Sequence, residues 1–167
     1  MKLQEYLEKY GNVEVEEKQL NELLGIKESK VWKPNNGDMY YCINMDGDVK
    51  QTRWSNSIFD DKCYLMGNIY QTEEEAEFAV EKRKVEVELQ RFAAEYNEAE
   101  IDWNNENQPK YCIYFVYINS QLKGLDANCY YVSHHNGIYF TSIEIAKQAI
   151  QAIGEDRLKK YYLGVEE

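Results

Sequence analysis

The chain has 167 residues, a length that suits one domain or two very small ones that share a core. Its 30 acidic and 19 basic residues give a formal net charge of −11, which disfavours nonspecific binding to nucleic acid or to an anionic membrane. No apolar run approaches the ~20 residues of a membrane span. The first residues do not show the basic start and apolar run of a signal peptide, so we expect none. The four cysteines lack CxxC spacing, so we expect reduced thiols in a cytosol.

Two short helices are predicted at the start of the chain. Residues 3–10 carry Leu and Tyr at helical spacing, and residues 16–24 carry three leucines on one face. The pair is similar to a helix-turn-helix DNA reader, but its glutamates would face the phosphates. We therefore predict that residues 1–30 form a helical segment that packs as an appendage.

The next part of the chain predicts a hairpin followed by a loop. Residues 39–54 read as two strands joined by a tight turn at Asp46-Gly47. Residues 55–62 read as a polar loop and residues 63–66 as a short extended segment. A further short strand at Ile69-Tyr70 then leads into a long helix.

Two helices are predicted to begin at a Thr-x-x-Glu capping box. In this box the Thr hydroxyl accepts the backbone N–H three residues on, and the Glu side chain accepts the N–H of the Thr itself. Thr72 with Glu75 starts a helix over residues 73–96, and Thr141 with Glu144 starts a second one. Each box follows a Gly and an Ile-Tyr pair, which indicates an internal repeat.

The second half of the chain predicts a similar series of elements. Residues 111–118 alternate apolar side chains on both faces, which indicates a central strand covered on both sides. Residues 119–126 read as a turn region and residues 127–133 as a strand. The helix that starts near residue 142 stops at Gly154, and a last short helix follows.

The repeat organises the predicted fold. We expect an α+β protein with two tandem β-β-β-α units that form one mostly antiparallel sheet of about six strands, with the helices packed on one face. Two further matches support the repeat: Tyr41-Cys42-Ile43 with Tyr111-Cys112-Ile113, and Cys63-Tyr64 with Cys129-Tyr130. The predicted parts are the N-terminal segment 1–30, a first unit 31–97, an acidic linker 98–110 and a second unit 111–167.

The acidic linker has two interpretations. Acidic residues follow one another from position 95 to position 106 without a basic residue, and Trp103 lies among them. The stretch is either a solvated loop with its Trp tucked into the core or an aromatic-centred acidic patch for a basic partner. The candidate partner-binding residues are Glu95, Glu98, Glu100, Asp102, Trp103 and Glu106.

No catalytic, cofactor or metal motif stands out. His134 and His135 are the only histidines, and adjacent residues at a strand end point to opposite sides, so one metal site could rarely use both. The glycines lie singly at turns, and no phosphate-binding loop is present. We therefore predict a protein that is not an enzyme and has no cofactor.

Several ordered segments resemble a known family. They are Val31-Trp32-Lys33-Pro34 with Gly37-Asp38-x-Tyr40-Tyr41, Gly67-Asn68-x-Tyr70-x-Thr72-Glu-Glu-Glu75-Ala76-Glu77, Ile101-Asp102-Trp103, and the tail from Ile153-Gly154 to Val165. Together they resemble a family of small uncharacterised proteins encoded by phages and prophages of Firmicutes. The resemblance covers nearly the whole chain and implies a host bacterial cytoplasm during infection. It transfers no catalytic or binding residues.

Three functional hypotheses follow. The first is a phage accessory protein that binds and inhibits a host factor, for instance an immune or nucleic-acid-handling defence protein, in an anti-CRISPR-like manner. Its acidic surface would imitate phosphate, and we expect no membrane partner, no direct nucleic-acid binding, and a monomer or homodimer. The second is a sponge that sequesters a nucleotide immune signal in a Tyr-rich pocket. The third is a structural or regulatory phage protein without a defence role. The candidate ligand-binding residues of the sponge are Tyr41, Arg53, Tyr114, Tyr130, His134 and His135.

Overall fold

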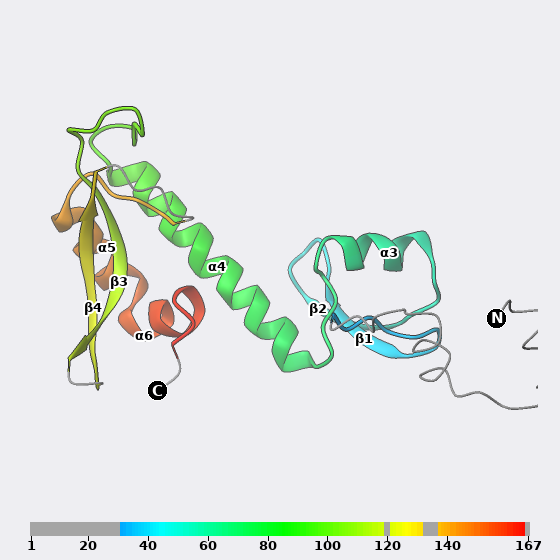
Figure 1. The fold of residues 1–167 in the computed structure, drawn as a ribbon. Coiled ribbons are helices and arrows are strands. Elements are labelled where there is room, and N and C mark those ends of the chain that lie inside the picture. Colours follow the sequence, from blue (N-terminus) through cyan, green and yellow to red (C-terminus); the bar gives the residue numbers. More distant parts are fainter. Residues whose placement is uncertain (1–30, 119–120, 132–136, 166–167) are drawn as a thin grey trace, which may run out of the picture. The chain divides into compact units, whose positions relative to one another are not determined.

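The computed structural model describes residues 31–118, 121–131 and 137–165 (Figure 1). The chain divides into two units, Met1–Asn35 and Asn36–Glu167, and all the elements described below belong to the second. The two helices predicted within residues 1–30 lie outside the described residues. The same holds for the histidine pair at positions 134 and 135.

The predicted hairpin is confirmed. Strands β1 (Met39–Ile43) and β2 (Val49–Arg53) pair antiparallel, with Met39 opposite Arg53 and Ile43 opposite Val49. The side chain of Asn44 closes the connecting loop, because its Oδ1 accepts the N–H groups of Asp46 and Asp48 at 2.9 and 2.8 Å. Gly47 has a φ of 87°, a backbone conformation that few other residues adopt without strain.

Helix α3 (Ile58–Leu65) stands where we predicted a polar loop and a short extended segment, and that prediction was wrong. Ser57 caps the helix in a reciprocal capping box with Asp60. The side chains buried on the inner face of α3 are Asp60 and Cys63, whereas its apolar side chains face outward. A prediction that expects the apolar face of a helix to be buried therefore does not find α3.

Helix α4 (Glu73–Tyr96) has the predicted bounds and the predicted cap. Thr72 Oγ1 accepts the N–H of Glu75 at 3.2 Å, while the Glu75 carboxylate accepts the N–H of Gln71 at 2.9 Å, one residue before the predicted donor. The helix packs on β1 and β2 and also on the elements that follow it in the chain. Its buried residues are Ala76, Val85, Leu89 and Ala93.

The second hairpin is longer than predicted. Strands β3 (Lys110–Ile118) and β4 (Gln121–Tyr130) pair antiparallel, with a register shift between Val116 and Tyr117, so most of the predicted turn region 119–126 belongs to a strand. Tyr114 and Phe115 are each 37% exposed. The prediction of a strand covered on both faces was therefore wrong.

Helix α5 (Ile143–Ile153) begins one residue later than the predicted capping box requires. Ser142 is the N-cap, and its Oγ accepts the N–H of Ile145 at 3.2 Å. The hydroxyl of Thr141 instead accepts the N–H of Glu98 at 3.1 Å. Gly154, with a φ of 98°, ends the helix as predicted, and the last helical turns are α6 (Glu155–Arg157) and the π-helix η1 (Leu158–Tyr162).

The predicted sheet of about six strands is wrong for the residues that the structure describes. These residues form two separate two-stranded sheets, β1-β2 and β3-β4. Each predicted third strand contributes a single bridge, between Tyr41 and Tyr70 in the first case and between Tyr111 and Phe140 in the second. Each region pairs at one residue only, because the chain then turns away from the sheet to reach its helix cap. The two short apolar runs contain too few residues both to pair as a strand and to lead into the helix.

The two halves nevertheless repeat a set of positions. The bridge residues Tyr41 and Tyr70 correspond to Tyr111 and Phe140, and the caps and the buried helix alanines keep the same difference of 70 in residue number. The matched pair of Cys63 and Cys129 does not hold, since the first lies on α3 and the second on β4. The main apolar core joins α4, β3, β4, α5 and η1, with Leu89, Phe140 and Leu158 fully buried.

Candidate functional site

The acidic linker is an ordered loop between α4 and β3 (Figure 1). It starts at Asn97, whose side chain is fixed to the chain just before α5. Asn97 Nδ2 donates to the carbonyl of Tyr139 at 3.0 Å, and Asn97 Oδ1 accepts the N–H of Thr141 at 3.0 Å. Together with the bond from Glu98 N to Thr141 Oγ1, these contacts tie the start of the loop to the second half of the chain.

Hydrogen bonds inside the loop hold its centre. The Gln108 side chain bridges two backbone groups, since its Oε1 accepts the N–H of Asp102 and its Nε2 donates to the carbonyl of Glu100, both at 2.7 Å. Asp102 Oδ1 accepts the N–H of Asn104 at 2.9 Å, and Asn105 Oδ1 accepts the N–H of Asn107 at 3.0 Å. Such turns of Asp and Asn give a loop a defined backbone without a helix or strand.

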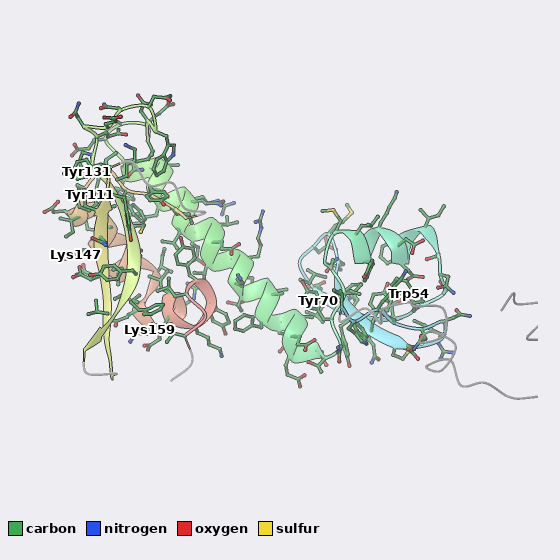
Figure 2. The ribbon with its side chains drawn as sticks, in the orientation of Figure 1. Trp54, Tyr70, Tyr111, Tyr131, Lys147 and Lys159 are labelled. Atoms are coloured by element: carbon green, nitrogen blue, oxygen red, sulfur yellow. The ribbon has the colours of Figure 1, made fainter. Side chains whose placement is uncertain are left out.

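A buried lysine anchors the end of the loop. Lys110 is fully buried, and its ammonium donates to the carbonyls of Asn105, Gln108 and Tyr131 at 3.0, 2.9 and 3.3 Å (Figure 2, where Tyr131 is labelled). The same ammonium lies 5.3 Å from the centre of the Trp103 ring, a cation–π distance. Trp103 in turn meets Tyr139 edge to face at 4.8 Å. The positive charge of Lys110 is thus buried against backbone carbonyls, and it does not offset the exposed carboxylates of the loop.

The candidate partner-binding residues fall into two groups. Trp103 is half-buried and belongs to the inner side of the loop, where it supports the backbone. The carboxylates are exposed, and none of them forms an ion pair with another residue that the structure describes. These carboxylates belong to Glu95, Glu98, Glu100, Asp102 and Glu106. The structure therefore brings the acidic candidates together on one short, ordered stretch.

A hollow lies where α4 ends and the loop begins. It has a volume of about 490 Å³ and is lined by Ala93, Ala94, Asn97, Ala99, Glu100 and Ile101. Three of these six residues are alanines, and Glu100 is the one with a carboxylate. A long cationic side chain could place its methylene groups on the alanines and its charge beside the carboxylate.

The four candidate residues of a nucleotide sponge that the structure describes are divided between two sheets. Tyr41 and Arg53 lie on the first sheet, whereas Tyr114 and Tyr130 lie on the second, and the two sheets share no strand. Two of the hydroxyls already have side-chain partners. Tyr41 Oη accepts from Gln51 at 3.0 Å, and Tyr130 Oη accepts from Asn128 at 3.4 Å.

A second acidic feature escaped the sequence analysis. A groove of about 740 Å³ runs along the first turns of α4, past the hairpin loop at Asp48 and up to the aromatic pair Phe78 and Tyr161. The signal in the sequence was the acidic run at the start of α4. The carboxylates that line the groove are Asp48, Glu73, Glu74, Glu77 and Glu81.

The thiols have the chemistry of structural residues. Cys42 and Cys63 are buried free cysteines, and burial raises the pKa of both, so the reactive thiolate form is suppressed. Within the described part of the chain, no group of three His, Cys, Asp or Glu side chains could hold a metal ion.

Comparisons with protein-family models, with curated proteins and with solved structures gave no match to the chain. No helix among the described residues combines the length and the apolar character needed to cross a membrane.

Proposed function

We propose that this chain is a phage-encoded accessory protein and not an enzyme. It binds a basic surface of a host protein and thereby inhibits that protein. The observation that carries the proposal is the loop of residues 97–110, an ordered stretch with exposed carboxylates and a buried lysine. Host proteins that bind nucleic acid, among them bacterial defence proteins, have the required basic surfaces. The phage origin rests on the family resemblance of the sequence.

The order of the loop matters for affinity. A flexible acidic tail must lose conformational entropy when it binds, whereas a loop already fixed by Asn97, Gln108 and Lys110 has little left to lose. Carboxylates held at fixed positions along a backbone present negative charge at intervals, as a phosphate chain does. A basic cleft that evolved for nucleic acid would then accept the loop, and the net charge of −11 would speed the encounter.

The other two hypotheses have less support. A nucleotide sponge needs converging aromatic and basic side chains, and the four described candidates are divided between two sheets. A structural or regulatory phage role would use the same soluble surface without a defence partner, and the time of expression during infection distinguishes it.

The proposal is tested by native mass spectrometry of the tagged chain recovered from phage-infected host cells. We expect a host protein at fixed stoichiometry. The recovered partner is then titrated against the triple variant E98K/E100K/E106K, which leaves the structural carboxylate of Asp102 in place. We expect at least a hundredfold loss of affinity, because three like charges now face the basic surface.

A matched control separates the loop from overall charge. The variant D48K/E74K/E77K reverses three exposed carboxylates of the α4 groove and changes the net charge by the same amount. We expect it to bind within a few-fold of the native chain. If the loop variant binds as the native chain does, the loop is not the interface and the proposal fails; if both variants lose equally, only overall charge matters.

A further inference from the structure

The hollow between the last turn of α4 and the acidic loop is formed before anything binds to it. Its lining includes three alanines, whose side chains have no rotamers to rearrange. Asn97 is fixed as well, because its amide group bonds to the carbonyl of Tyr139 and to the N–H of Thr141, both at 3.0 Å. The volume of about 490 Å³ lies within the ~300–1,000 Å³ of ligand-binding pockets. A side chain of another molecule therefore meets a preformed hollow.

The end of α4 favours a cation at this place. The final carbonyl groups of a helix have no partner inside the helix, and they form the negative end of its dipole. The N–H of Asn97 closes the last turn on the carbonyl of Ala93 at 3.0 Å. The next N–H, that of Glu98, donates to Thr141 Oγ1 instead, so the carbonyl of Ala94 does not receive it. The structure describes α4 over its whole length, and its last turn contains no basic residue.

The charge inside the hollow has the same sign. Glu100 contributes a carboxylate, and none of the described residues that line the hollow is basic. The backbone of Glu100 is held in place, since its carbonyl accepts Gln108 Nε2 at 2.7 Å. Charge complementarity therefore favours a cation, and the alanines favour one that has an apolar stem. Among protein side chains, lysine and arginine have both.

We propose that the hollow takes an arginine side chain of the host protein. Its methylene groups lie on the alanines, and its guanidinium lies between the Glu100 carboxylate and the carbonyl groups that end α4. Arginine suits this place better than lysine, because its planar fork of five N–H donors serves a carboxylate and carbonyls together and is less strongly hydrated than an ammonium. The inference rests on the proposed function, since it names the residue by which the same host protein is recognised.

Solution NMR tests the hollow without the host protein. The probe is N-acetyl-arginine amide, titrated into the full chain to millimolar concentrations. The lysine and norleucine analogues are the matched probes, one with a different cation and one with no charge. We expect the arginine probe to shift the amide signals of residues 93–101 and to bind about fivefold more tightly than the lysine probe, while the norleucine probe shifts none. An arginine probe that shifts none of these signals, or binds no better than the lysine probe, overturns the proposal.

A variant that fills the hollow separates it from the charges of the loop. Ala94→Leu adds an apolar side chain at an exposed position of α4 and leaves every carboxylate in place. We expect it to abolish the shifts caused by the arginine probe and to weaken the host protein about tenfold. The control Ala152→Leu makes the same change at an exposed position of α5 and should do neither. Amide signals outside the hollow that match those of the native chain show that both variants are folded.

The outcomes distinguish the hollow from the proposed function. If Ala94→Leu binds the host protein as the native chain does while E98K/E100K/E106K does not, the proposed function stands and the arginine pocket is overturned. If both variants bind as the native chain does, the loop is not the interface and both proposals fail. If no host protein is recovered, the proposed function fails, and the titration with the arginine probe still decides whether the hollow binds a guanidinium.

Discussion

At the scale of single residues, the buried carboxylate of Asp60 joins helix α3 to strand β1. Burial by itself raises the pKa of this carboxyl, but the hydrogen bonds from Ser55, Ser57 and Tyr40 outweigh it and keep the pKa well below its usual range. The same carboxylate takes part in the capping box of α3 and accepts the hydroxyl of Tyr40 on β1. It also accepts the backbone N–H of Ser55, just before the helix. Removing its charge should therefore weaken several contacts at once.

The variant Asp60→Asn should lower the free energy of unfolding by about 3 kcal/mol at pH 7, because an amide NH₂ then faces buried donors. Urea unfolding measures the loss. The control Asp61→Asn changes an exposed neighbour and should cost less than about 1 kcal/mol. Equal losses in the two variants would contradict the role given to Asp60.

The effect has a defined pH dependence. The pKa of Asp60 is lower in the folded chain than its ordinary unfolded value of ~3.9, so its contribution is fully present above about pH 5 and is lost as the pH falls through that value towards the folded pKa. The difference between the native chain and the Asn variant should therefore shrink below about pH 4. A difference that stayed constant in acid would show that the carboxylate charge is not the cause.

At the scale of elements, the caps decide where the helices begin. Ser142 rather than Thr141 caps α5, because the Thr hydroxyl is already used by the loop through Glu98 N. Ser142→Ala should lower the free energy of unfolding by about 1 kcal/mol and speed hydrogen exchange at the first amides of α5. Thr141→Ser keeps the hydroxyl that accepts Glu98 N–H and should leave both unchanged; a Ser142→Ala variant that lost nothing would show that residue 142 is not the cap.

Local patterns were enough to predict the first hairpin and α4. The long amphipathic repeat, the Thr72 cap and the Asp46-Gly47 turn are signals that neighbouring residues supply. Helix α3 was missed because its apolar residues face solvent, which reverses the rule that the prediction used. The signal that could have found it is the Ser57-x-x-Asp60 box, which does not depend on which face is buried.

The sheets and the loop depend on contacts that no local pattern contains. Ile69-Tyr70 and Ile138-Tyr139 read as strands, yet each region contributes one bridge before the chain turns to its cap. The acidic residues of the loop were visible in the sequence, but its order was not. Part of that order comes from Asn97, whose partners lie 42 and 44 residues further along the chain.

At the scale of the whole molecule, net charge should govern the proposed association with a basic partner. A net charge of −11 would attract such a partner, so added salt should weaken the binding and slow the association. Binding kinetics at low and high salt measure the affinity and the association rate, and values that do not change with salt would contradict the role given to charge.

The repeat also sets how the two halves differ. Tyr40 and Lys110 hold equivalent positions in their first strands, and both are fully buried. The first donates a hydroxyl to the carboxylate of a helix, whereas the second donates an ammonium to the carbonyls of a loop. The equivalent position thus binds a helix in the first half and a loop in the second. The acidic loop is the one that the lysine binds.

The anchored loop changes how a protease meets the chain. A polar, acidic stretch between two repeated halves reads like a cleavable hinge, but a protease needs a segment that can open locally and extend into its cleft. Opening residues 97–110 would break the contacts of Asn97, Gln108 and Lys110 together. The loop of residues 97–110 is therefore a poor protease site despite its polar sequence, and we expect limited proteolysis to leave the two halves of the chain joined.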